Sequence, residues 1–534
     1  MSREDEFRET PSAVRFDRRR FLQLVGGLAG AAAFSQLRPD LAGAAPSLGE
    51  YPFNLGVASG DPLPNGVVLW TRLAPRILEP DGGMPGTRIP VGWRIAKDED
   101  MRQVVRRGSV VALPELAHSV HVDIHGLQPG REYFYQFDYR DETSPVGRTR
   151  TAPQPGATVD SLAFAFASCQ DWSHGYYSAY RRMAEEELDF VVHLGDYLYE
   201  YGIDANGGFR NVPVPDQFRP NCTTLGRYRL QHSLFKSDPD LQRAHGLFPW
   251  MIVWDDHEVE NDYAGLTPAF GEQNPEFTAR RAFAYQAFYE HIPLRVSALP
   301  GFDDLRIYRR FTWGDLAELS LLDTRQYRSN QVCGDGEFPR CEESLDPAVT
   351  MLGEKQERWL MQGLGSSRSR WNVIAQQVLM AQLDHNRGDP RIYWHDAWDG
   401  YPLARQRLVD GLLRRRVRNP VVITGDWHST FVSDIKQDFS DPGSATVATE
   451  FAGTSISSNG DGVVYGPYYG PMIPANPHIK FFDGDRRGYV RCRLDAESWR
   501  TDLRMVSTVS RADAPVETFA SFVVEDGRPG AIRA

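Results

Sequence analysis

Apolar runs about as long as a β-strand recur along the chain from residue 160 onward. They lie at 162–167, 189–194, 250–254, 316–322, 371–378 and 421–424. Amphipathic stretches that favour helices, such as 176–187 and 354–363, lie between them. Strands that are apolar throughout are buried on both faces of a sheet, and their alternation with helices is typical of a layered α/β domain. We therefore expect one α/β domain over 160–534, with its chemistry beyond the carboxyl ends of the strands.

The residues between 51 and 153 show a different, all-β pattern. Strand-length runs at 66–72, 91–95 and 121–124 are separated by glycine and proline turns, and 149–153 would form the last strand and exit. The segment 127–135 resembles the turn and strand of a fibronectin type III sandwich, in which a buried tyrosine anchors the strand. This pattern predicts a fibronectin type III-like sandwich of about 100 residues over 51–153.

Residues 1–45 fit neither pattern. A polar start leads into Asp-Arg-Arg-Arg-Phe-Leu-Gln at 17–23, followed by a weakly apolar run rich in glycine and alanine. This resembles a twin-arginine signal peptide with Gln23 in place of the usual lysine, and 42–45 offers a small-residue cleavage site. The alternative, a basic amphipathic first helix, fits the glycine-rich run less well. The resemblance implies export by the twin-arginine machinery to the periplasm, the medium or the cell wall. That route often carries proteins that fold around a metal before transport.

The overall composition excludes several classes of protein. Of 534 residues, 59 are basic and 71 acidic, which gives a net charge of −12, and 41% are hydrophobic. This share of apolar residues can form a core, so disorder is excluded. The mean hydropathy of −0.45, and the lack of any run of about 18 uncharged apolar residues, argue against a transmembrane span. The acidic balance argues against tracking along nucleic acid.

The five cysteines fall into three sets. Cys333 and Cys341 flank a short turn-like segment and are the best candidates for a disulfide. Cys222 and Cys492 either pair or stay free. Cys169 stands apart because it ends an apolar strand.

Polar side chains follow most of the predicted strands. They stand at 168–170 (Ser-Cys-Gln), 195–199 (Gly-Asp-Tyr-Leu-Tyr), 255–262 (Asp-Asp-His-Glu-Val-Glu-Asn-Asp), 323–325 (Asp-Thr-Arg), 376–377 (Gln-Gln) and 425–429 (Gly-Asp-Trp-His-Ser). Each alone has an ordinary explanation, such as a turn or the amino-terminus of a helix. Together they are too acidic to lie side by side without cations, so they indicate a metal centre.

These motifs, in this order behind a β-sandwich, are similar to those of the PhoD-type alkaline phosphatases/phosphodiesterases. That family is a branch of the calcineurin-like metallophosphoesterases related to the purple acid phosphatases. The similarity extends from 53–61 through 398–402 and 425–429 to 450–458. It implies a β-sandwich-cored metallophosphoesterase domain with helices outside, a carboxyl-terminal extension, and an N-terminal domain of the same family over 51–153.

The resemblance also implies a role for each matching residue on the iron side of the centre. Asp196 matches the aspartate that bridges the metals, and Tyr199 matches the tyrosinate that binds ferric iron in the purple phosphatases. His428 would also bind iron. Cys169 stands where the superfamily normally has its first aspartate ligand. Thiolate and phenolate ligands favour Fe³⁺.

On the second metal, carboxylates replace the ligands that the superfamily usually has. Asp256 takes the position of an asparagine, and Asp426 takes that of a histidine. Hard oxygen ligands favour Ca²⁺ over zinc or manganese, which is consistent with the iron and two calcium ions that the resemblance implies. Further oxygen ligands are expected from Asp255, Asn261 and Gln377.

The implied reaction is hydrolysis of phosphate mono- and diesters by a metal-activated hydroxide. His257 would donate a hydrogen bond to the phosphoryl or leaving-group oxygen. Arg325 would either neutralise charge on the phosphoryl group or form a structural ion pair. We expect a monomer that acts on small organophosphates or phospholipids.

Two alternatives remain open at this point. One is an exported phospholipase D of the same family, with lipid access through aromatic residues at 393–398 or 465–469. The other is a non-catalytic exported protein that uses its β-sandwich for adhesion.

Overall fold

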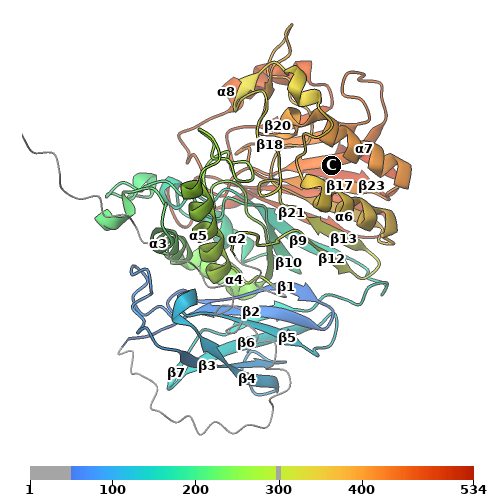
Figure 1. Cartoon of the computed structure of the whole chain (residues 1–534). Coiled ribbons are helices and arrows are strands. Elements are labelled where there is room, and N and C mark those ends of the chain that lie inside the picture. Colours follow the sequence, from blue (N-terminus) through green and yellow to red (C-terminus); the bar gives the residue numbers. More distant parts are fainter. Residues whose placement is uncertain (1–49, 296–301) are drawn as a thin grey trace, which may run out of the picture.

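A computed structural model gives the structure of residues 50–295 and 302–534 (Figure 1). The signal peptide expected at 1–45 lies outside these described residues. Within them, no helix is both long and apolar enough to cross a membrane.

Two large sheets form the core of the described part of the chain. One has ten strands. Their order is β24 (Arg528–Arg533), β23 (Val516–Glu525), β22 (Ser498–Val506), β21 (Arg487–Leu494), β9 (Leu162–Ala167), β10 (Phe190–His193), β11 (Pro249–Ile252), β1 (Val57–Leu63), β2 (Gly66–Arg72) and β5 (Ser119–His125). The other has seven strands. Their order is β12 (Arg309–Trp313), β13 (Ala317–Leu321), β15 (Trp371–Ala375), β17 (Pro420–Thr424), β19 (Thr446–Ala452), β18 (Thr430–Lys436) and β20 (Ile479–Asp483).

The two sheets pack face to face through aromatic side chains. Phe190 of the ten-stranded sheet lies 5.2 Å from Trp313 of the other sheet, and Trp499 lies 5.9 Å from Trp371, both measured between ring centroids. These rings belong to the largest apolar cluster of the described residues. The expected layered α/β domain with a β-sandwich core is therefore confirmed, and every apolar run expected to be a strand contains one.

Helices cover the outer faces of this sandwich. Leu360 of α6 (Gly353–Ser366) and Leu408 of α7 (Pro402–Arg415) share a core with Ile374 of the seven-stranded sheet. Helices on the opposite side pack into the core of the ten-stranded sheet (Figure 1). They are α2 (Ser178–Met183), α3 (Leu225–Lys236), α4 (Pro239–Leu247) and α5 (Pro275–His291). The short α8 (Gly466–Tyr469) lies at the far end of the molecule from the N-terminal strands, and β14 (Glu337–Phe338) pairs with β16 (Tyr393–Trp394).

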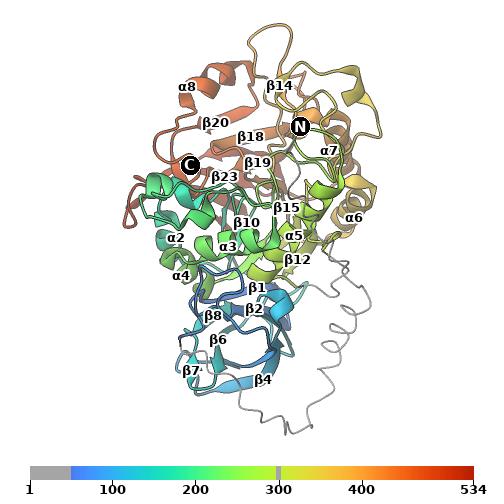
Figure 2. The same ribbon diagram turned by 60° about the vertical axis from the view of Figure 1, so that its left-hand side comes forward.

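The N-terminal region is a β-sandwich, as the sequence predicts (Figure 2). One of its layers consists of β4 (Val104–Ala112), β3 (Ile89–Ala96), β6 (Glu132–Tyr139), β7 (Glu142–Thr143) and β8 (Gly147–Arg150). A separate apolar core joins this layer to β1, β2 and β5. The backbone N–H of Gln128 donates to the hydroxyl of Tyr133 at 3.0 Å, so the expected buried tyrosine anchors its turn.

The second layer of this sandwich belongs to the ten-stranded sheet, so the N-terminal sandwich and the region after it share one sheet. β1 pairs in parallel with β11, with Gly60 opposite Trp250. Asp61 also binds Arg309 at 2.8 Å. Because all residues of β1 except Leu63 are buried, the burial pattern of the strand does not reveal which strand is its second neighbour, and that neighbour lies 190 residues away in the sequence, with Gly60 opposite Trp250. The carboxyl-terminal extension in turn adds β21 to β24 beside β9.

Candidate metal centre

The polar segments that follow the strands meet at one edge of the core. Cys169 follows β9, Asp196 follows β10, and Asp255 follows β11, which are parallel neighbours. Asp426 follows β17 of the facing sheet. The carboxyl ends of parallel strands lie at the same edge of a sheet, so these loops converge although they are far apart in sequence.

One group of ligand atoms combines sulfur, oxygen and nitrogen. The thiol of Cys169, a carboxylate oxygen of Asp196 and a ring nitrogen of His428 lie within 4.8 Å of one another. The hydroxyl of Tyr199 lies 3.0 Å from Asp196 Oδ2 and 3.0 Å from His428 Nε2. The four residues that the resemblance assigns to iron therefore surround one point.

A second group beside it is made of carboxylates. Oxygens of Asp255, Asp256 and Asp426 lie within 4.8 Å of one another, and Asp256 also groups with Asp196 and His257. Asp196 thus belongs to groups on both sides, which is the geometry that a bridging ligand requires.

Four of these residues have a left-handed backbone. The φ angles are 60° for Cys169, 54° for Asp196, 63° for Asp426 and 52° for His428. This conformation is unfavourable for residues other than glycine and is found most often where function requires it. The backbone turns sharply at these residues, and all four side chains contribute to the groups described above.

The carboxylates have the properties of a cation-binding site. Asp196 Oδ1, Asp255 Oδ2 and Asp256 Oδ1 are buried and have no hydrogen-bond partner among the described residues. Burial and the neighbouring carboxylates raise the pKa of Asp196 and Asp426 well above the usual range, and burial raises that of Asp255 to about 7. Such oxygens are stabilised as anions by a bound cation, so the residues fit the expected metals.

Among the softer ligands, Cys169 and Tyr199 are buried and His428 is partly buried. Burial, with the charge of Asp196, raises the pKa of Cys169 and of Tyr199 well above their usual values. Burial lowers the pKa of His428 to about 3, so its ring is neutral and can offer a lone pair. Thiolate and phenolate are ligands only without their protons, and a metal ion would compensate for the cost of that charge.

His257 is held by a residue that the sequence analysis missed. Glu200 Oε2 lies 2.8 Å from His257 Nδ1, and Glu200 Oε1 accepts from the backbone N–H of Asn261 at 2.9 Å. Burial alone would lower the pKa of His257, but the charges of Asp256 and Glu200 outweigh it and raise the pKa well above its usual value. Glu200 directly follows Tyr199 in the sequence, yet nothing in its pattern distinguishes it from a structural glutamate.

Glu258 is a second residue that was missed. Its carboxylate accepts hydrogen bonds from the backbone N–H groups of Asp196 at 3.1 Å, Tyr197 at 2.7 Å and Asp255 at 2.8 Å. It therefore joins the loops after β10 and β11 and fixes two of the candidate ligands.

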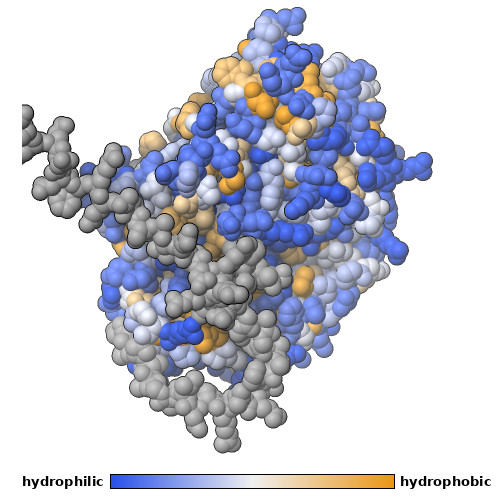
Figure 3. Space-filling model, in the orientation of Figure 1, coloured by the Kyte–Doolittle hydropathy of each residue, from blue (hydrophilic) through white to orange (hydrophobic). Residues whose placement is uncertain are grey.

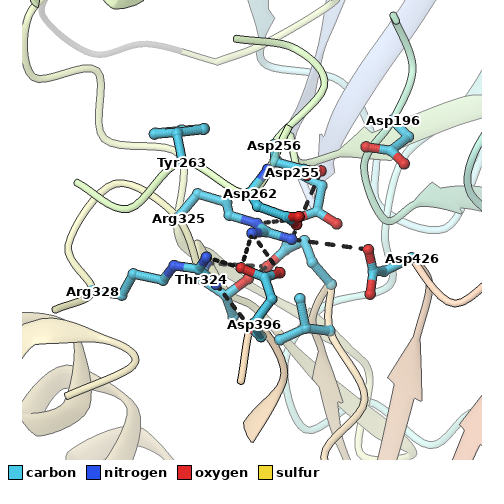
Figure 4. Close-up of polar contacts among 12 residues, drawn as sticks. Asp196, Asp255, Asp256, Asp262, Tyr263, Thr324, Arg325, Arg328, Asp396 and Asp426 are labelled. Carbon is cyan, nitrogen blue, oxygen red and sulfur yellow. Dashed lines mark hydrogen bonds and ion pairs between the residues drawn. The ribbon is translucent and has the colours of Figure 1, made fainter. Parts of the chain in front are cut away.

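Arg325 lies in the middle of an acidic network (Figure 4). It is fully buried, binds Asp255 through Nε, and binds Asp396 Oδ2 through Nη1 at 2.7 Å. Its Nη2 lies 3.7 Å from Asp256 and 3.9 Å from Asp426. Of the two roles left open by the sequence, this geometry favours the structural ion pair.

Two expected oxygen ligands have other contacts. The Gln377 side chain accepts from the hydroxyl of Thr324 at 2.6 Å and donates to the carbonyl of Leu322 at 2.9 Å, so its amide is already used. Gln377 is therefore not available as a ligand, which corrects the expectation. Asn261 donates through Nδ2 to Asp262 Oδ2 at 2.6 Å, so the Oδ1 of Asn261 is the side-chain atom that remains as a possible ligand.

A further acidic group lies beside the centre and was not anticipated. Oxygens of Asp262, Asp335 and Asp396 lie within 4.8 Å of one another. Arg325 and Arg328 both bind Asp396. Asp262 ends the acidic run at 255–262, whereas Asp335 lies between Cys333 and Cys341 and Asp396 lies among the aromatic residues at 393–398, two segments with no predicted ligand.

The cysteines fall into the expected sets. A disulfide joins Cys333 to Cys341. Cys222 and Cys492 are both buried and free, so the alternative in which they pair is not realised.

Comparisons with known proteins point to one family. A family model described as PhoD-like phosphatase matches residues 164–503, and one described as PhoD-like phosphatase, N-terminal domain, matches residues 40–153. The chain is 46% identical over 523 residues to alkaline phosphatase D of Bacillus subtilis (strain 168), which covers 96% of this chain and 88% of that protein. A solved structure described as PhoD is similar with a TM-score of 0.87 and 47% identity, covering 92% of this chain and 93% of that one.

Proposed function

The chain belongs to the PhoD-like phosphatase family and is a phosphoric ester hydrolase, and we propose that the centre described above is where it cleaves phosphate mono- and diesters. The observation that carries this proposal is the position of Asp196. It groups with Cys169 and His428 on one side and with Asp256 and His257 on the other. This arrangement supports two neighbouring cations that share a ligand.

We propose that Cys169, Asp196, Tyr199 and His428 hold Fe³⁺, and that Asp255, Asp256 and Asp426 hold two Ca²⁺ with Asp196 between them. Asn261 Oδ1 is a further oxygen that a calcium ion could use. Bound cations at such a site polarise the phosphoryl group and lower the pKa of water. The unpartnered carboxylate oxygens and the mixture of soft and hard ligands support this assignment.

His257 is the proposed hydrogen-bond donor to the ester. Glu200 holds Nδ1, so Nε2 is left to face the phosphoryl or leaving-group oxygen. The charges of Asp256 and Glu200 raise the pKa of His257, which favours the protonated ring that donates. Arg325 is proposed to position Asp255 and Asp396 rather than to contact the substrate.

We further propose that the protein is exported by the twin-arginine route and acts as a monomer. The signal-like residues at 1–45 support export. The disulfide between Cys333 and Cys341 supports it independently, because disulfides persist in oxidising compartments.

A phospholipid diester is a second candidate substrate, and one surface feature favours it. Residues 462–477 contain no ionisable side chain except tyrosine, yet Val463, Val464 and Tyr468 are exposed. Figure 3 shows apolar residues at the top of the molecule, where Figure 1 places α8. Tyr469 from this segment contacts Trp427, which stands between two proposed ligands. An apolar surface so near the centre suits the apolar part of a lipid.

The proposed function is tested by elemental analysis together with assays on three substrates. We expect the protein to contain iron and calcium and to turn over p-nitrophenyl phosphate or its bis ester. Turnover confined to phosphatidylcholine vesicles would favour the phospholipase. A protein that holds zinc alone would contradict the proposed metals, and one that turns over none of the three would be a binding protein.

A further inference from the structure

The segment 454–458, Thr-Ser-Ile-Ser-Ser, follows β19 and is part of the family resemblance, but the proposed chemistry gives it no role. It is fully or almost fully buried and packs against the loop that carries Cys169. The backbone N–H of Ile456 donates to the carbonyl of Ser168 at 3.0 Å, and that of Ser458 donates to the carbonyl of Cys169 at 3.3 Å. The segment is therefore fixed against the metal centre by main-chain hydrogen bonds.

The hydroxyl of Ser458 contacts a proposed ligand directly. Ser458 Oγ donates to the Tyr199 hydroxyl oxygen at 2.7 Å. Ser458 Oγ also accepts from the backbone N–H of Asp171 at 3.1 Å. Because the Tyr199 hydroxyl donates its own proton to Asp196 Oδ2 at 3.0 Å, the proton between Ser458 and Tyr199 comes from the serine.

The tyrosine oxygen has two further neighbours, and both are proposed ligands. Asp196 Oδ2 and His428 Nε2 each lie 3.0 Å from it. A tyrosine hydroxyl has one proton and can donate to one of them at a time. When the oxygen binds a cation it has no proton, so the hydrogen bond from Ser458 is the contact that persists.

Ser457 provides a contrast within the same segment. Its hydroxyl donates to the backbone carbonyl of Asp171 at 2.8 Å, and among the described residues its side chain makes no hydrogen bond to a proposed ligand. Both serines thus hold the loop at Asp171, but only Ser458 among these two also bonds to a proposed ligand.

We propose that Ser458 is a positioning residue that donates a hydrogen bond to the metal-bound oxygen of Tyr199, fixing its place and limiting its electron donation. This inference rests on the proposed metal centre. Hydrogen bonds from outside the ligand set orient metal ligands, and their removal typically lowers metal affinity by about 10- to 100-fold. The hydrogen bond also lowers the energy of the phenolate electrons, so its loss should move a tyrosinate-to-iron absorption band to longer wavelength.

The test compares Ser458→Ala with Ser457→Ala in the full chain loaded with ferric and calcium salts. Ser458→Ala should shift the visible band to longer wavelength and lose metal to EDTA at least about 10-fold faster than the wild type. Ser457→Ala should resemble the wild type in both. Ser458→Cys, which keeps a weak donor of similar size, should fall between the wild type and alanine. Circular dichroism confirms that each variant is folded.

Failure of this inference can be distinguished from failure of the proposed function. If the wild type binds no iron and has no visible band, the proposed metals are wrong. The role of Ser458 is then decided with the metal that elemental analysis identifies, by comparing how fast the variants lose that metal to EDTA. If Ser458→Ala and Ser457→Ala lose metal at the same rate, the inference is overturned. The same holds if both variants have the absorption band of the wild type.

Discussion

Glu200 Oε2 lies 2.8 Å from His257 Nδ1, and the two buried side chains form an ion pair at the edge of the metal centre. Glu200 also accepts from the backbone of Asn261, so its own position is fixed. The pair therefore determines which way the imidazole faces and which nitrogen remains for the substrate.

Replacing Glu200 by glutamine should lower kcat while leaving KM almost unchanged. An oriented proton or hydrogen-bond donor contributes about 10²- to 10⁴-fold, so a loss of about 10- to 100-fold is expected when its orientation is weakened. Steady-state kinetics with p-nitrophenyl phosphate measure the effect. Glu186→Gln, at a carboxylate bound by Tyr489 and Arg491, is the matched control. An unchanged kcat in Glu200→Gln would show that His257 does not depend on this partner.

Replacing Arg325 by methionine should destabilise the protein. The change leaves Asp255 buried without its ion pair and Asp396 with Arg328 alone, and breaking a buried pair typically costs about 3–5 kcal/mol. Arg370→Met, which breaks a half-exposed pair with Asp526, should cost about 1 kcal/mol or less. Urea denaturation compares the two. Normal stability with a large loss of kcat would instead place Arg325 on the substrate.

Removal of the cations should lower the melting temperature. Without them, the neighbouring carboxylates of Asp255, Asp256 and Asp426 have only Arg325 to offset their charge. A ligand present at about 100 times its Kd stabilises the folded state by about 2.7 kcal/mol, so CaCl₂ added after dialysis against EDTA should restore most of the loss. Thermal denaturation followed by circular dichroism measures the melting temperature before chelation, after chelation and after calcium is added back. Identical melting before and after chelation would argue against a metal at these residues.

Lys236 should make stability depend on pH. It is buried, its Nζ donates to the Tyr197 hydroxyl at 3.2 Å, and burial lowers its pKa to about 7. In the unfolded chain the pKa of this lysine is about 10.4. Below pH 7 both states carry the proton and the cost of burying the charge is present in full. Between pH 7 and about 10 only the unfolded state carries it, so this contribution to stability rises with pH.

Lys236→Met removes this cost. It should stabilise the protein most below pH 7, and the gain should shrink by roughly 1 kcal/mol per pH unit between about pH 7 and pH 10. Urea denaturation at pH 6, 8 and 10 tests this, with the exposed Lys355→Met as control. A gain that does not change with pH would show that Lys236 keeps its charge when buried.

The catalytic region should not fold without the N-terminal strands. A fragment of residues 155–534 would leave β11 without its neighbour β1, and would leave Arg309 without Asp61. An exposed, apolar strand edge favours aggregation. The fragment should therefore be insoluble alone and become soluble when residues 50–153 are co-expressed. A soluble, cooperatively melting fragment would show that the shared sheet is dispensable.

The sequence was sufficient for the features that depend on local pattern. Apolar runs such as 162–167 located the strands, because burial on both faces imposes a continuous apolar character. The motifs after those strands predicted that Cys169, Asp196 and Asp426 would lie near one another, because the carboxyl ends of parallel strands lie at the same edge of a sheet.

Features that depend on distant partners were decided only by the tertiary structure. Glu200, Glu258 and Ser458 have no distinctive local pattern, since each acts through a hydrogen bond to a residue on another loop. The structural role favoured for Arg325 required the position of Asp396, which is 71 residues away. A sequence pattern indicates whether a side chain is buried or exposed. The roles of these residues depend instead on which two atoms lie within about 3 Å of each other, and only the tertiary structure determines that.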